Sequence, residues 1–533
     1  MLKMPIGIRS FSRLRSEGYV YVDKTNYLID LIDGGRAYFV SRPDRFGKSL
    51  AISALDALFS DKRDLFDGLY GRSFFDRHDY APSPVVHLQM SETAIFDGPD
   101  GVKKSIINIA HNNAERLGVR IVPRTPAEAI SQLVDLASEK YGAPPAVLVD
   151  DFDRPLLESV NSPELVKLVR EILLEFYAGI AASGDSTRFV FIAGVSRDIG
   201  LFPSMEGLKD ISCDPRYAAM FGFTEDELSI FMDSHIQETS SALEVTKERL
   251  ISRMRNYYAG YSFLDGRKRL FNPLSVLNFF QKREFRNYWF ESAAPSFLMD
   301  YVKRRGVEAE NFRGIEFDET VCEPEMENAS PDCFLLFGGY LSVRERNGVR
   351  AVLDYPNKEV LSSFAKFIMY AKLDIPSSGS ASVALERALS KGGVGELIEI
   401  YDKLLMVVPE EIYESQERKY GAGRNSGTER LAVSFFHSLL FTLLWAARVK
   451  TKSESLLESG VLEATKNNHN YIIALEVAGG DFEKAADALA ERIRSDGKTG
   501  RYRRFNESDL AIIVVDEAAR RVATHRTDRA VTP

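Results

Sequence analysis

The sequence predicts an α/β protein whose N-terminal part is a parallel sheet with helices on both faces. Short runs rich in β-branched and aromatic residues alternate there with longer stretches of helical periodicity. Four of these runs are predicted to be buried strands: 37–41, 85–90, 146–150 and 189–195. Each run ends in polar residues, and ligands of open α/β sheets bind beyond the carboxyl ends of the strands. We therefore expect the chemistry of this protein at that edge of the sheet.

Length and composition exclude several classes of protein. The chain has 533 residues, of which 45% are apolar and 27% are charged, as is typical of a folded protein with several domains. The net charge of -9 argues against a nucleic-acid binder with an overall basic surface. Three cysteines, Cys213, Cys322 and Cys333, are too few for a disulfide framework. Without a signal peptide or an apolar run of bilayer length, we expect a cytoplasmic protein with no membrane span.

Changes along the chain predict five segments. An α/β domain over 1–235 is followed by a helical or winged accessory domain over 236–345. A helical connector over 346–428 ends in a glycine-rich joint, and a second α/β domain covers 429–520. The last residues, 521–533, are predicted to form a flexible tail. Within the second α/β domain we expect a helix over 429–447, strands over 461–465 and 471–477, a helix over 482–494 and a strand over 510–515.

A phosphate-binding loop is the sharpest local signal. Residues 41–49, Ser-Arg-Pro-Asp-Arg-Phe-Gly-Lys-Ser, connect a predicted strand to a helix that begins near Ser49. Gly47 permits close approach of the backbone to an anion, and Lys48 can reach the outer phosphates of a nucleotide. The Ser49 hydroxyl can hold Mg²⁺. Arg42 replaces the first glycine of the common motif, and an ordinary turn before a helix is the alternative interpretation.

Two carboxylates at a strand end favour the phosphate-loop interpretation. Asp150 and Asp151 follow an apolar strand about a hundred residues downstream of the loop. We predict that Asp150 orders the Mg²⁺ shell and that Asp151 acts on the attacking water. Acidic residues also solubilise strand ends, which is the alternative here. Because glutamate is more usual in the water-activating role, the shorter Asp151 predicts slow or conditional hydrolysis.

Further polar residues are candidates for the chemistry of phosphate transfer. Ser196 follows strand 189–195, where it either senses the γ-phosphate or positions water, or simply starts a loop. Arg45, Arg197 and Arg216 are candidates to neutralise charge in the transition state, and a neighbouring subunit is another source of such an arginine.

Six ordered motifs together resemble the bacterial AAA-ATPase-like family. The motifs are 5–11 (PIGIRSF), 19–25 (YVYVDKT), 41–50 (SRPDRFGKSL), 150–155 (DDFDRP), 193–196 (AGVS) and 208–223 (LKDISCDPRYAAMFGF). The resemblance implies a P-loop NTPase domain of the ASCE type that binds ATP and Mg²⁺. Arginine at the first loop position, here Arg42, is tolerated in that family. The chain departs from the family at Asp151, where glutamate is usual, and at Glu206-Gly207, where paired asparagines are usual.

The same family commonly carries a C-terminal domain similar to PD-(D/E)xK nucleases. The resemblance therefore implies a restriction-endonuclease-like α/β domain, whose acids correspond to Glu463 and Glu476. Ala478 stands where such nucleases have their lysine, which predicts a degenerate site. Cleavage would require a lysine from elsewhere, such as Lys466 or Lys484.

A basic segment near the C-terminus is a candidate surface for nucleic acid. Residues 484–504 include seven basic and three acidic residues, and 501–505 interleave arginine with aromatic rings. A solvated helix face is the alternative. His437 and His469 are isolated histidines, for which packing or exposure is more frequent than metal binding.

We predict a protein that binds ATP and Mg²⁺, hydrolyses ATP, and couples nucleotide state to the C-terminal domain. The predicted nucleotide contacts are Arg42, Arg45, Phe46, Gly47, Lys48, Ser49 and Leu50. One alternative is a nucleotide-gated module that binds nucleic acid or a protein with little turnover. Another is a Mg²⁺-dependent nuclease with a relocated lysine. The preference for ATP over GTP stays open at this point, as does assembly into a homo-oligomer.

Overall fold

The computed structural model divides the chain into two compact units, residues 1–364 and 365–533. The finer division into five segments stays a prediction. The described residues are 2–77, 80–95, 98–160, 162–289, 314–318, 329–361, 363–364, 385, 388–407, 436, 440, 443–444, 449–452, 460–466, 469–478, 480–498, 508–516 and 521–529.

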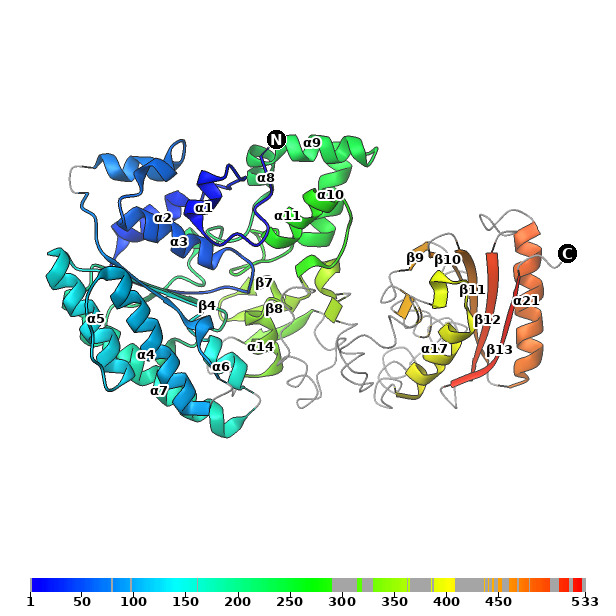
Figure 1. Ribbon diagram of the computed structural model, residues 1–533. Helices are drawn as coiled ribbons and strands as arrows, with labels where there is room; N and C mark the ends of the chain where they lie inside the picture. The colour runs from blue at the N-terminus through cyan, green and yellow to red at the C-terminus, as the bar shows by residue number, and fades with distance from the viewer. Residues whose placement is uncertain are drawn as a thin grey trace. The chain divides into compact units, whose positions relative to one another are not determined.

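A five-stranded parallel sheet lies at the centre of the first unit (Figure 1). Its strand order is β2-β3-β4-β1-β5, and every neighbouring pair is parallel. The strands are β1 (Ala37–Ser41), β2 (Val85–Gln89), β3 (Ala146–Asp150), β4 (Phe189–Gly194) and β5 (Lys209–Asp210). The four predicted strands are confirmed, although β2 and β4 each end one residue earlier than predicted. At β2 the chain turns into a 3₁₀ helix at Met90, and at β4 the amide of Val195 bonds to a side chain instead of a strand.

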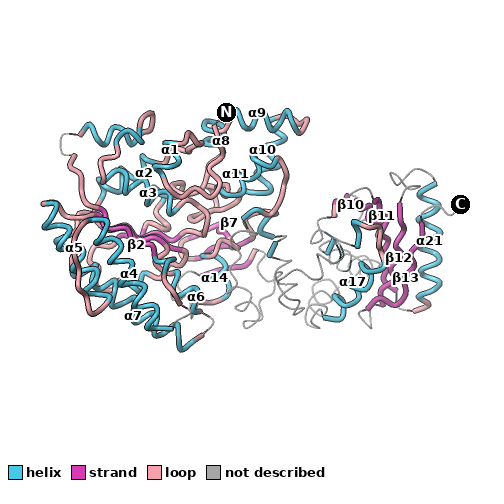
Figure 2. Tube along the Cα trace, viewed as in Figure 1, coloured by secondary structure: helices cyan, strands magenta, loops and turns pink. Residues whose placement is uncertain are grey.

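Helices cover both faces of this sheet (Figure 2). One face packs against α4, α5 and α7, whose apolar side chains join those of the strands in a hydrophobic core. The other face carries α3. The helices of this domain are α1 (Phe11–Ser16), α2 (Thr25–Gly34), α3 (Lys48–Phe59), α4 (Gly98–Leu117), α5 (Pro126–Tyr141), α6 (Arg154–Ser159) and α7 (Pro163–Ala182). Local sequence sets their starts: the hydroxyls of Thr125 and Ser162 cap α5 and α7, each followed by proline in the first turn.

Helices predominate in the remainder of the first unit, where a small antiparallel sheet is also present. The elements are α8 (Glu225–Phe231), α9 (Asp233–Ala242), α10 (Lys247–Tyr258), α11 (Pro273–Lys282), β6 (Ile315–Asp318), α14 (Pro331–Phe337), β7 (Ser342–Asn347) and β8 (Arg350–Asp354). The sheet has the order β6-β8-β7 and was not predicted. Val20 and Val22 of the N-terminal segment join the apolar core of α8 to α11. The first residues of the chain are therefore built into this helical cluster.

The second unit contains a five-stranded mixed sheet in the order β13-β12-β11-β10-β9. Its described elements are α17 (Gly395–Val407), β9 (Lys450–Lys452), β10 (Val461–Lys466), β11 (His469–Ala478), α21 (Phe482–Lys498), β12 (Ser508–Asp516) and β13 (Arg521–Arg529). Strands β11 and β12 run parallel, and the other neighbours are antiparallel. Helix α21 packs on the sheet through Ala486, Leu489, Ala490 and Ile493, the spacing of one helical face.

The C-terminal residues 521–529 are ordered as a strand of the second unit. The flexible tail predicted over 521–533 is wrong for residues 521–529, which form β13. This strand pairs with β12 along its length, and the Arg526 guanidinium forms ion pairs with Glu483 and Asp487 of α21. Strand β13 lies at the edge of the sheet, where polar residues are common. Because a polar edge strand has a composition similar to that of a flexible tail, the sequence did not distinguish the two. The helix predicted over 429–447 lies almost entirely outside the described residues.

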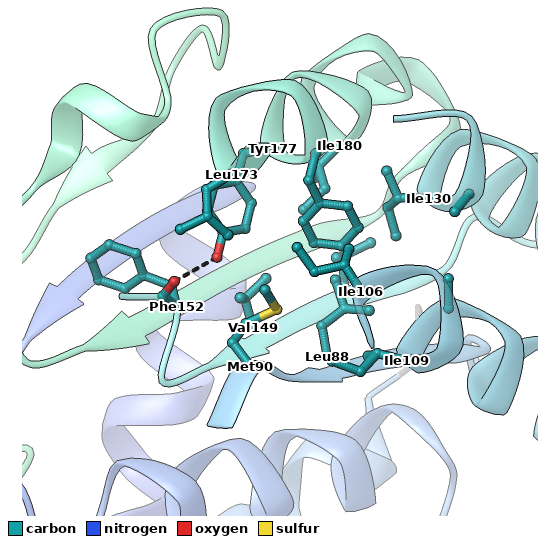
Figure 3. Close-up of a cluster of buried hydrophobic side chains, with 14 of the residues drawn as sticks. Leu88, Met90, Ile106, Ile109, Ile130, Val149, Phe152, Leu173, Tyr177 and Ile180 are labelled. Atoms are coloured by element: carbon teal, nitrogen blue, oxygen red, sulfur yellow. Dashed lines mark hydrogen bonds between the residues drawn. The ribbon is translucent and has the colours of Figure 1, made fainter. Parts of the chain in front are cut away.

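One buried hydrogen bond ties the sheet to α7 beneath the turn that follows β3 (Figure 3). The Tyr177 hydroxyl donates to the Phe152 carbonyl over 2.7 Å, and both residues are at most 1% exposed. Tyr177→Phe keeps the ring but leaves that carbonyl without this donor. We expect the free energy of unfolding of the first unit to fall by about 1 to 3 kcal/mol, measured by urea titration.

Tyr70→Phe is the control for this measurement, because Tyr70 is 58% exposed. It is expected to change the free energy of unfolding by less than about 0.5 kcal/mol. Equal effects of the two substitutions would show that the buried hydrogen bond contributes no more than a surface hydroxyl.

Candidate functional site

The loop between β1 and α3 has the backbone of an anion site. Gly47, the N-cap of α3, has φ 103°, a conformation that favours glycine, and Arg45 also has a positive φ of 68°. Among the described residues, the backbone N–H groups from Asp44 to Leu50 donate no hydrogen bond to another protein group. Such a row of unpaired amides at a helix N-terminus attracts phosphate.

Lys48 lies across this loop with its ammonium group largely withdrawn from solvent. Its side chain is 4% exposed. The Nζ atom donates to the carbonyls of Arg42 and Pro43 over 2.8 and 3.0 Å, and it lies 3.3 Å from Asp44 Oδ1. The loop thus holds its own cation at the place where the amides are unpaired.

Asp150 brings a carboxylate to the same region from the carboxyl end of β3. The residue is fully buried, and neither carboxylate oxygen has a hydrogen-bond partner among the described residues. Burial raises the pKa of Asp150, whereas the Ser49 hydroxyl and the Lys48 charge act in the opposite direction. An unsatisfied carboxylate beside a serine hydroxyl is the oxygen donor set that Mg²⁺ prefers, so the residues present fit this ion.

Asp151 follows in a left-handed backbone conformation, with φ 54°. Burial, followed by the neighbouring charge of Asp150, raises its pKa to about 6. Gln89 on β2 donates a long hydrogen bond of 3.4 Å to its Oδ2 atom. A carboxylate with such a pKa can accept a proton near neutral pH, which suits a general base.

A cavity of about 340 Å³ is lined by the loop, Lys48 and Asp151 together with an apolar wall, whereas Asp150 is not among its lining residues. Its polar end includes the loop, Asp151 and the basic side chains of Arg9 and Arg154. Its apolar end comes from three distant segments: the N-terminal strand-like segment, the residues before α8, and α11. The apolar lining residues include Val20, Tyr21, Val22, Met220, Phe221, Phe223, Leu274 and Leu277. A pocket with one polar and one apolar end is suited to a ligand that combines phosphates with a flat ring.

Most of the predicted contact residues line this cavity. They are Arg45, Phe46, Gly47, Lys48, Ser49, Leu50 and Asp151. The Arg42 side chain is an exception. Its guanidinium donates to the carbonyls of Ser41 and Ser212 and packs 4.3 Å over the ring of Phe263, so it does not face the cavity.

The other predicted polar groups lie away from the cavity. Ser196 is fully buried at the end of β4 and is not a lining residue. Arg197 and Arg216 form ion pairs with Asp210 and Asp214, respectively. Of the three candidate arginines, Arg45 is the one that reaches the cavity wall.

The sequence analysis missed a positioning role for Asp153. This carboxylate is 1% exposed and accepts hydrogen bonds from the backbone amides of Val195 and Ser196. It therefore fixes the end of β4 against the turn after β3. Asp153 is the third aspartate of the Asp-Asp-Phe-Asp motif at 150–153, and this motif was the available signal in the sequence. Arg9 and Arg154 also line the cavity. They lie in the motifs 5–11 and 150–155, but the sequence did not predict a role for either.

The acids predicted for the C-terminal unit lie on one sheet face but out of register. Glu463 pairs with Ile472 across β10 and β11, whereas Glu476 lies four residues further along β11. Alternation places both on the face that packs against α21. Within the described part of the chain, no group of three histidines, cysteines or acids is arranged for a metal ion. The nuclease-like assignment stays a prediction, and His437 and 501–505 lie outside the described residues.

Ionised Asp151 is expected to destabilise the nucleotide-free protein. Its pKa of about 6 lies above the ordinary 3.8, so the folded state binds this proton more tightly than the unfolded state. The penalty therefore appears as the pH rises through that interval and is complete above it. We expect Asp151→Asn to raise the free energy of unfolding by about 1 to 3 kcal/mol at pH 7.5, with the gain vanishing near about pH 4.

Thermal and urea unfolding at both pH values measure this gain, with Asp135→Asn on the exposed surface of α5 as control. Asparagine also tolerates the left-handed conformation of residue 151, so backbone strain does not mask the effect. A loss of stability at pH 7.5 would contradict the expectation.

Comparisons with known proteins agree with this geometry. Residues 5–199 match the sequence model of a family described as "Predicted AAA-ATPase". Over 517 residues the chain is 28% identical to a protein of Azotobacter chroococcum mcd 1 described as "Uncharacterized protein in vnfD 5'region". That match covers 95% of this chain and 94% of the relative. In the described residues, no helix combines the length and the apolar character needed to cross a membrane. Residues 5–199, which contain the loop and the acidic strand end, thus carry the sequence features of an AAA-ATPase-like domain.

Proposed function

We propose that this chain binds ATP with Mg²⁺ in the cavity beside α3 and hydrolyses it. The observation that carries the proposal is the row of unpaired backbone amides from Asp44 to Leu50, gathered around a buried lysine. Lys48 already donates to two loop carbonyls, but a ligand without oxyanions would leave the amides unpaired. A triphosphate supplies the oxygens that they need.

The side chains divide the work of hydrolysis between them. Lys48 would neutralise charge on the outer phosphates, and the loop amides would orient them. Ser49 and Asp150 would hold Mg²⁺, which when bound neutralises phosphate charge. Asp151 would take the proton of the attacking water, because its raised pKa allows it to exist as either acid or base near neutral pH.

The strand order supports an ASCE-type arrangement. Strand β4 lies between β1, which leads into the loop, and β3, which carries the acids. Because all three strands are parallel, their carboxyl ends meet at the same edge of the sheet. Asp153 then locks the ends of β3 and β4 to each other, which limits the freedom of Asp151. The coupling of nucleotide state to the C-terminal unit stays a prediction.

The apolar end of the cavity favours adenine over guanine. Guanine carries two kinds of N–H donor on its pairing edge, N1–H and the 2-amino group, whereas adenine carries only its 6-amino group, so guanine requires more acceptors in a specific site. The described acids that line the cavity are Asp44, Asp151 and Glu158; the first two belong to the polar end, and the third pairs with Arg154. Lys24, which also lines the cavity, already donates to Glu227 and to a backbone carbonyl.

Substitution of the two central residues separates binding from turnover. Lys48→Ala is expected to lower kcat/KM for ATP by on the order of a hundredfold or more, because the outer phosphates lose their cation. Asp151→Asn is expected to keep nucleotide binding but to lower kcat by on the order of a hundredfold, because the proton acceptor is gone. Phosphate release with Mg²⁺ measures turnover, calorimetry measures binding, and Asp135→Asn is the control. ATPase activity that survives both substitutions unchanged would defeat the proposed function.

Base preference is measured by the same calorimetry with two purine nucleotides. We expect MgATP to bind at least about tenfold more tightly than MgGTP, because guanine would leave its donors unpaired against the apolar wall. Removal of Mg²⁺ by a chelator is expected to weaken the binding of both. Equal or tighter binding of MgGTP would contradict the assignment of the apolar end to adenine.

A further inference from the structure

The phosphate loop contains an acidic side chain of its own. Asp44 lies four residues before Lys48, and its Oδ1 atom is 3.3 Å from the lysine Nζ. Its other oxygen, Oδ2, is 3.8 Å from the Arg154 guanidinium. Burial alone would raise the pKa of Asp44, but the charges of Lys48 and Arg154 lower it below its ordinary value. In the described structure an ionised carboxylate therefore lies among cations that a triphosphate would need.

The backbone at Asp44 is held from outside the loop. The indole N–H of Trp289, a residue 1% exposed, donates to the Asp44 carbonyl over 3.0 Å. Pro43, the residue before Asp44, is in close contact with Gly339. A Cβ atom added to Gly339 would lie only 2.6 Å from Pro43 Cβ. These contacts fix the main chain of 43–44. The carboxylate can leave Lys48 by side-chain rotation, without unfolding the loop.

A carboxylate and a phosphate make the same demand on a lysine. Both are oxyanions that accept charge-assisted hydrogen bonds, and the two repel each other when they share one cation. Glu158 provides a comparison within the same cavity: it pairs with the Arg154 Nε atom over 2.6 Å and forms no ion pair with Lys48. Of these two acids, Asp44 is the one that pairs with the loop lysine.

We propose that Asp44 acts as an internal competitor for the phosphate site. Its carboxylate neutralises Lys48 in the empty loop and must be displaced when nucleotide binds. This inference rests on the proposed function and adds to it a residue that sets nucleotide affinity. The loop is thereby stable without ligand, at the expense of weaker binding.

The sign of a substitution distinguishes this role from an ordinary ligand contact. If Asp44 helped to hold nucleotide or Mg²⁺, its neutralisation would weaken binding. If it competes for Lys48, Asp44→Asn strengthens binding and at the same time lowers the melting temperature of the nucleotide-free protein. If Asp44 were purely structural, its substitution would lower the stability of the protein without strengthening nucleotide binding.

The test is calorimetry of MgATP with the full-length chain. We expect Asp44→Asn to bind MgATP about three- to tenfold more tightly than the unsubstituted protein, since one negative charge is removed beside the phosphates. Asp135→Asn, the matched control, removes one negative charge from the exposed surface of α5 and is expected to change affinity by less than about twofold. Asp44→Ser is a second variant in case the asparagine variant does not fold.

Each outcome is decisive. Tighter binding by the Asp44 variants alone, with a lower melting temperature without nucleotide, supports the internal competitor. Unchanged or weaker binding by both Asp44 variants overturns it while leaving the proposed function intact. An equal gain in Asp135→Asn also overturns it, because the effect would then be one of total charge. Absence of MgATP binding by the unsubstituted protein refutes the proposed function and this inference together.

Discussion

A single buried ammonium group organises the polar end of this protein. The Nζ atom of Lys48 donates hydrogen bonds to two loop carbonyls and to the Asp44 carboxylate. Its charge also acts to lower the pKa values of Asp150 and Asp151, against the effect of burial. Three aspartates lie around this one lysine, while the neighbouring amides remain unpaired. The burial of Lys48 and Asp150 strengthens these interactions, since water screens charges less there. In the proposed complex, a divalent cation would offset carboxylate charge and phosphate oxygens would accept hydrogen bonds from the unpaired amides.

The fold holds these charged side chains close together by fixing the positions of the elements that carry them. Parallel strands bring the loop after β1 and the acids after β3 to one edge of the sheet. Hydrogen bonds to two side chains then immobilise the acidic turn: the Tyr177 hydroxyl donates to the Phe152 carbonyl, and the Asp153 carboxylate accepts from the amides of Val195 and Ser196. Strain and repulsion at Asp151 persist because these surrounding contacts determine its position.

The cavity depends on a second kind of contact, between segments far apart in the chain. The N-terminal residues near Val20 pack into the core of α8 to α11, and these same segments supply the apolar wall. The Lys24 ammonium joins them further through Glu227, over 2.5 Å. Movements of the helices after residue 223 would therefore change the shape of the pocket.

Sequence alone determined the features that depend on neighbouring residues: the four central strands, the loop with Gly47, and the acidic strand end. Periodicity and turn chemistry are local, so they are legible without coordinates. Only the tertiary structure decided that Arg42 turns toward Phe263, that Asp44 meets Lys48 within a buried network, and that residues 521–529 pair as an outer strand. Those outcomes follow from packing and charge contacts between distant segments, whose energies no short window of sequence contains.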